Sequence, residues 1–140
     1  MSCILRIIGA NLDIDYFITN SGLNPYKKSY KGQPKLTTKP EGEKLSFSGL
    51  SIETSASDFD DLKKQIEDTI TYLEQNQAKL KFINSTKEIE YAILDFGVDL
   101  RIDGEKNLFK FEKFPSKLLK LAGDLGLDIE LSIYPSDIDI

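Results

Sequence analysis

The sequence predicts an α+β fold, namely a curved, mainly antiparallel sheet of about six strands with about three helices packed on one face. Apolar and polar residues alternate cleanly in several segments, which is typical of a sheet with one covered and one wet face. Other segments place apolar residues three and four positions apart, as on one side of a helix. A length of 140 residues fits one domain, so we expect a single α+β domain over residues 1–140.

The N-terminal segments predict a strand, a helix and a second strand. Residues 3–9, CILRIIG, predict a largely buried strand with one internal charge, Arg6. The helix that follows has Asp13 as its N-cap and Gly22 as its left-handed stop. Glycine and proline punctuate residues 26–44, which predict a loop and leave one short strand near 26–31 open. A strand begins at Leu45, and Gly49 predicts a bulge or bend within it.

The longest helix is predicted over residues 59–76, because apolar residues recur along one of its faces and Asp58 is suited to cap its start. A further helical turn or two is expected over 78–83, after a break near Asn76. Strand patterns then begin at Glu88 and at Phe96 with a shift in phase, which a bent or bulged strand would explain.

The C-terminal segments predict a hairpin, a helix and a last strand with one wet face. The Asp103-Gly104 pair is a strong hairpin signal before a strand that begins at Leu108. A helix is expected from Pro115 to a stop at Gly126. In the last strand we expect Leu127, Ile129, Leu131 and Ile133 to face the core, while Asp128 and Glu130 face solvent.

Composition argues against most enzyme chemistry. The chain has no histidine, one cysteine and no tryptophan, which excludes imidazole bases, internal disulfides and Cys- or His-based metal sites. We therefore predict no catalytic residue, no cofactor and no metal, and the sequence favours a non-enzymatic role without settling it. No segment is suited to span a membrane or act as a signal peptide, so we expect a cytoplasmic protein.

Clusters of carboxylates offer one enzymatic alternative. Acidic pairs near Asp13, Asp58 and Asp137 have the oxygen ligands that a divalent cation prefers. The first two clusters lie where helices are predicted to start, so capping of free N–H groups is the preferred interpretation.

A lysine-rich loop supplies the candidate ligand site. Residues 26–44 hold six lysines against two acidic residues, and two tyrosines interleave with them. A small anionic ligand would be bound by the Tyr/Lys segment 26–35, with the candidate residues Arg6, Tyr26, Lys28, Tyr30 and Lys31. Arg6 also has a structural interpretation, because a charge inside an apolar strand needs a partner, for which Asp95 and Glu90 are candidates.

The acidic remainder of the chain favours a protein partner. The net charge of −5 disfavours nucleic acid and anionic lipid. The predicted helix 59–76 presents Glu67, Asp68 and Glu74 as a candidate docking surface. Pairing of exposed strand edges leaves a homo-oligomer open as well.

The order of these segments resembles a bacterial family known as domain of unknown function 4279. The resemblance rests on the helix stop SGLNP at residues 21–25, the Lys31-Gly32 pair and the helix-strand unit at 115–134. It implies a small α+β protein of no established activity. Some small acidic proteins of this kind act as immunity partners for secreted toxins, so by analogy we expect a non-enzymatic protein-binding module of immunity type.

Overall fold

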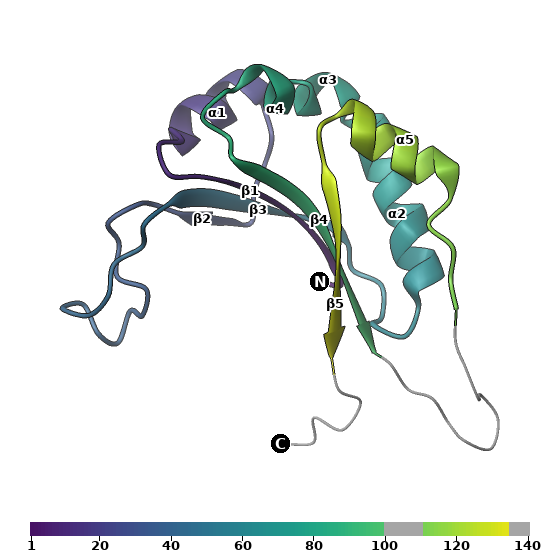
Figure 1. The fold of residues 1–140 in the computed structure, drawn as a ribbon, viewed down its shortest axis with the longest axis horizontal. Helices are drawn as coiled ribbons and strands as arrows, with labels where there is room; N and C mark the ends of the chain where they lie inside the picture. The colour runs from purple at the N-terminus through teal and green to yellow at the C-terminus, as the bar shows by residue number, and fades with distance from the viewer. Residues whose placement is uncertain (100–110, 135–140) are drawn as a thin grey trace.

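The computed structural model describes residues 1–99 and 111–134. They form a five-stranded sheet with all helices on one side of it (Figure 1). The strands are β1 (Cys3–Gly9), β2 (Lys27–Ser29), β3 (Ser48–Ser55), β4 (Tyr91–Asp99) and β5 (Asp128–Tyr134). The helices are α1 (Ile14–Ser21), α2 (Leu62–Gln75) and α5 (Ser116–Asp124), with two four-residue turns, α3 (Gln77–Leu80) and α4 (Phe82–Ser85). The predicted α+β class with one helix-covered face is confirmed.

The sheet has the strand order β2-β3-β1-β4-β5. Strand β1 lies in the middle and pairs antiparallel with β3 and β4, while β2 extends the sheet antiparallel to β3. Strand β5 runs parallel to β4, and helix α5 lies in the crossover connection that parallel pairing needs. A mainly antiparallel sheet is therefore confirmed, with one parallel edge.

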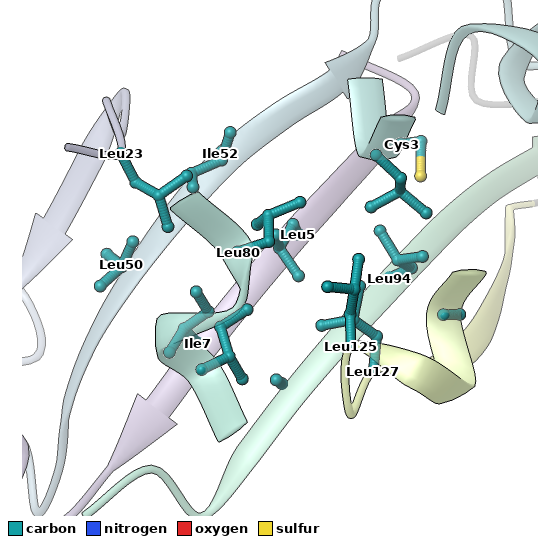
Figure 2. Packing of buried hydrophobic residues seen from close by; sticks show 14 of the residues in the cluster. Cys3, Leu5, Ile7, Leu23, Leu50, Ile52, Leu80, Leu94, Leu125 and Leu127 are labelled. Atoms are coloured by element: carbon teal, nitrogen blue, oxygen red, sulfur yellow. The ribbon is translucent and has the colours of Figure 1, made fainter. Parts of the chain in front are cut away.

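The core lies between the sheet and the helices. In β1 the alternate residues Cys3, Leu5 and Ile7 are fully buried and point toward the helices, beside Leu94 of β4 (Figure 2). Burial raises the pKa of the Cys3 thiol to about 11, which keeps it protonated and unreactive. This free cysteine serves as a small buried residue.

The N-cap residue of α1 is the predicted one, but the N-cap residue of α2 is not. Asp13 accepts a hydrogen bond from the Tyr16 N–H at 3.1 Å, so its predicted capping role is confirmed. The longest helix begins three residues later than predicted, because Asp61 rather than Asp58 accepts from the Lys64 N–H. Residues 58–61 form a turn before the helix, which frees Phe59 to reach the sheet.

Two predicted irregularities are absent from the strands as described. Strand β3 begins at Ser48, and its pairing with β1 is regular across Gly49; the register shift lies at the other end, between Cys3 and Ile4. Gly49 marks a close approach instead, since an alanine Cβ there would lie 3.2 Å from the Ile7 carbonyl oxygen. The patterns from Glu88 and Phe96 belong to one strand, β4, which keeps a continuous register with β1, so the predicted bend or bulge between them is absent.

The apolar side of β5 is less covered than predicted. Ile129 is half-buried, but Leu131 and Ile133 are 44% and 54% exposed. Helix α5 packs beside the start of this edge strand, so the helix layer does not reach its end (Figure 1). Glu130 is exposed, as expected. The Asp103-Gly104 turn and the start of the strand predicted at Leu108 lie outside the described residues, and residues 111–114 belong to no strand.

The two glycines that follow helices α1 and α5 should differ in how much stability is lost when each is replaced by alanine. Gly22 and Gly126 both have a φ of 75°, a conformation that costs an L-residue about 1 kcal/mol or more. An added Cβ at Gly22 meets only the Lys79 side chain at 3.8 Å, whereas at Gly126 it would collide with the Asn84 carboxamide. We expect Gly126→Ala to lower the free energy of unfolding more than Gly22→Ala, as measured by urea denaturation. Equal losses would show that the Asn84 contact does not matter.

Candidate functional site

The helix-free side of the sheet, called here the open face, gathers most of the polar strand residues. The cross-strand register places on it Lys27 of β2; Ser51 and Glu53 of β3; Ile4, Arg6 and Ile8 of β1; Tyr91, Ile93, Asp95, Gly97 and Asp99 of β4; and Asp128, Glu130, Ser132 and Tyr134 of β5. No helix of the described residues covers this side (Figure 1). The open face therefore presents strand side chains from all five strands to a partner.

Arg6 stands at the centre of the open face between two carboxylates. Its guanidinium lies 2.9 Å from Asp95 of β4 and 2.8 Å from Glu130 of β5. The Ser132 hydroxyl donates to Asp95 at 2.6 Å. The Asp95 side chain is only 9% exposed, while that of Glu130 is 50% exposed. The predicted partner Asp95 is confirmed. Glu90 is not the partner, because its carboxylate accepts from the Ala10 N–H.

Apolar and aromatic side chains surround this charged centre. Ile4, Ile8 and Ile93 are half-buried although no helix covers them. At one end of the face Phe59 meets Tyr134 edge to face, with ring centroids 5.5 Å apart. Phe59 reaches this position because Gly97 leaves room for its ring. Isoleucine, tyrosine, phenylalanine and arginine around a polar centre resemble the composition of protein interfaces.

The five predicted ligand residues do not converge. Arg6 lies on the open face, whereas Lys28 pairs with the core residue Leu50 and so lies on the helix side. Tyr30 also leaves the open face, since its hydroxyl donates to Asp15 of α1 at 2.8 Å. That hydrogen bond is the main cause that raises the pKa of the Tyr30 phenol above its ordinary value.

The other two members of the predicted set also lie apart from Arg6. The Lys31 N–H donates to the Ser48 hydroxyl at 2.9 Å. Tyr26 lines a cavity beside the end of α1, which also holds Tyr72 and Lys79. Sequence reasoning missed these two residues, because their helical spacing indicates only a solvated helix surface. That the five residues bind a ligand stays a prediction. Of these five, Tyr26 lines the cavity beside α1.

Two lysines of the lysine-rich loop interact with other residues of the same loop. Lys35 pairs with Glu43 at 2.9 Å, and the Lys44 ammonium donates to the Pro40 carbonyl. Main-chain hydrogen bonds from Lys35 to Glu43 and from Leu45 to Gln33 connect the two sides of the loop. The loop projects from the sheet edge beside β2 (Figure 1), which fits the role of lysines as solvating groups at an edge.

The acidic residues proposed on α2 are largely engaged within the helix layer. Glu74 pairs with Lys117 of α5 at 3.2 Å, and Asp68 pairs with Lys64 at 3.1 Å. The Ser57 hydroxyl is the main cause that lowers the pKa of Asp68 below its ordinary value. These carboxylates connect elements of this chain, so the open face replaces them as the candidate acidic surface.

Carboxylates in the described residues do not gather as metal ligands. Asp13 and Asp61 cap helices, and no group of three or more potential ligands could hold a metal ion in residues 1–99 and 111–134. None of the helices in the same residues is long and apolar enough to cross a membrane.

The fold and the open face define a small α+β protein whose mixed sheet has one helix-covered side and one uncovered, charged side. The chain belongs to the family described as Domain of unknown function (DUF4279), whose model matches residues 1–136. The resemblance inferred from the sequence is thus confirmed. Searches of curated proteins and of solved structures give no match to this chain.

Proposed function

We propose that this protein is a non-enzymatic binding module of the cytoplasm that docks a basic protein surface on its open face. The observation that supports the proposal is the combination on one uncovered sheet face of half-buried isoleucines, an aromatic pair and the Arg6 ion-pair cluster. An immunity-type association with a basic toxin is one specific form of this proposal.

The size of the open face suits a protein partner. Five strands about 4.8 Å apart and seven residues of about 3.3 Å each give a plan area of roughly 500 Å². A standard interface removes about 800 Å² of accessible surface from each partner, and a corrugated face exposes more than its plan area. A small molecule would need a concave site instead.

Charge on the open face favours a basic partner. Its acidic side chains are Glu53, Asp95, Asp99, Asp128 and Glu130, against the basic side chains of Lys27 and Arg6. Two copies of this face would bring like charges together, so the charge disfavours a homodimer formed through it. A basic partner would instead be steered toward the face by long-range attraction.

The proposal predicts that association depends on the charge of the open face. Lysine in place of both Asp128 and Glu130 should lower the association rate with the partner captured from cell extract at least about tenfold. For the unchanged protein, raising salt from about 0.05 M to about 0.5 M should slow association similarly, because screening shortens the range of attraction. Surface plasmon resonance with the purified partner measures both effects.

A control reverses one charge elsewhere, which is half the charge change of the double variant. Asp124 lies on α5 in the helix layer, where its side chain is 69% exposed beside Lys120. Asp124→Lys should leave the association rate within about twofold of the unchanged protein. Equal losses from the open-face and control variants, or a rate independent of salt, would refute docking on the open face.

A further inference from the structure

A cavity of about 300 Å³ lies on the helix side of the sheet, where α1 ends and β2 begins. Leu23 follows α1, Tyr26 precedes β2, and Ile52 comes from β3, while α2 and α3 contribute Tyr72 and Lys79. The cavity thus combines apolar side chains with a phenol and an ammonium group. These side chains lie apart from the Arg6 cluster on the opposite face.

The main chain of β3 is open at this cavity. The Tyr26 N–H donates to the Ser51 carbonyl at 3.0 Å, and the pairing of β2 with β3 reaches no further than Ser51. Backbone groups of alternate residues point to the same side of a strand. Glu53, two residues after Ser51, therefore directs its N–H and C=O past the start of β2, and it lines the cavity. A strand edge of this kind can pair with an extended segment.

Two side chains add donors beside that edge. Burial raises the pKa of the Tyr72 phenol to about 12, so it stays protonated and can donate. Lys79 brings the positive charge, and in residues 1–99 and 111–134 no ion pair forms with it. The Glu53 side chain belongs to the open face, where its carboxylate lies 3.9 Å from the Met1 amine. The carboxylate of Glu53 thus points away from the cavity that its main chain lines.

We propose that this cavity binds the C-terminal residue of an extended peptide. The peptide carboxylate would meet Lys79 and the Tyr72 hydroxyl, and the last peptide unit would pair with the main chain of Glu53. An apolar terminal side chain would pack on Leu23 and Ile52. Addition to a strand edge and capture of a terminal carboxylate are two known modes of peptide recognition.

A peptide explains the arrangement better than a free small anion does. A free anion needs only the positive charge and donors, whereas the open edge at Glu53 offers one donor and one acceptor with the spacing of a peptide unit. The site is independent of the proposed open-face function, because it uses the main chain of Glu53 and side chains on the helix side. Failure of one proposal therefore leaves the other intact.

The test is a titration of the ¹⁵N-labelled full chain, followed by amide chemical shifts. The probes are the acetylated tetrapeptide Ala-Ala-Ala-Leu with a free carboxylate, the same peptide with an amidated end, and acetate. We expect the free-acid peptide to shift the amides of residues 22–24, Tyr26 and Glu53 and to bind at least about tenfold more tightly than the other two. Equal binding of the amide or of acetate, shifts elsewhere, or no binding would overturn the proposal.

Variants test the two side-chain donors. Lys79→Gln and Tyr72→Phe should each weaken binding of the free-acid peptide several-fold, with a smaller loss for the amidated peptide. Lys81→Gln is the matched control, because Lys81 is exposed on the adjacent helical turn and does not line the cavity. The amide spectrum of each variant reports whether it is folded. Unchanged affinity in both folded variants, or an equal loss in Lys81→Gln, would also overturn the proposal.

Discussion

Alanine in place of Gly9 is expected to lower the free energy of unfolding by about 3 kcal/mol, at the upper end of typical overpacking costs. An added Cβ at this position would collide with the main-chain carbonyl of Glu88 and lie 3.2 Å from the Leu12 Cβ. A backbone carbonyl cannot turn away as a side chain can. The strand end would have to move, although the Glu90 N–H donates to the Ile8 carbonyl there at 2.8 Å.

Gly123 provides the matched control for this substitution. It lies in α5, and an added Cβ would meet nothing within 4 Å. Gly123→Ala should therefore raise the free energy of unfolding by about 0.5–1 kcal/mol, because alanine has the higher helix propensity. Urea denaturation with unchanged m-values measures both changes. A loss below about 1 kcal/mol for Gly9→Ala would show that the strand end adapts easily.

The sequence predicts those parts of the fold whose cause is local. The alternation in β1, the Asp13 cap and the left-handed Gly22 follow from neighbouring residues, and the structure confirms each of them. The close approach at Gly9 depends on Glu88, far along the chain, and Gly9 has no left-handed φ to mark it. Sequence patterns could not identify it.

The errors in β4 and α2 have a shared physical cause. Tyr91 and Ile93 alternate as if they faced the core, but the helix-facing residues are Ala92 and Leu94, so apolar residues occur on both faces of β4. Phe59 fits the helical spacing of α2, yet it packs beside Tyr134 at the end of the sheet. In both cases an apolar residue contributes to the open face, and periodicity alone assigns it to the core.

The candidate site was predictable only in part. A charge within the apolar run of β1 indicated an ion pair, and Asp95 was correctly named as a partner of Arg6. Glu130 could not be named, because the parallel pairing of β5 with β4 decides which acidic residue lies beside Arg6. The cavity at Lys79 likewise depends on where β2 begins, which composition does not reveal.

The Arg6 cluster gives the second large expected effect. Arg6→Met should lower the free energy of unfolding by about 3–5 kcal/mol, because it leaves the buried Asp95 carboxylate without a counter-charge. Within residues 1–99 and 111–134, the Ser132 hydroxyl would be the donor left to it. The double variant Arg6→Met with Asp95→Leu should recover most of this loss, since an apolar pair of similar volume replaces the ion pair. Urea denaturation of both single variants and the double variant measures the coupling.

The same double variant separates stability from function. It should fold with nearly the stability of the unchanged protein, yet it removes the arginine and a carboxylate at the centre of the open face. If the cluster only stabilises the fold, binding of the basic partner would be unaffected. If it also contacts the partner, the double variant should lose affinity at least about tenfold, because arginine at the centre of an interface is often a hot spot. Failure of the double variant to recover stability would instead show that the ion pair has no apolar substitute in this sheet.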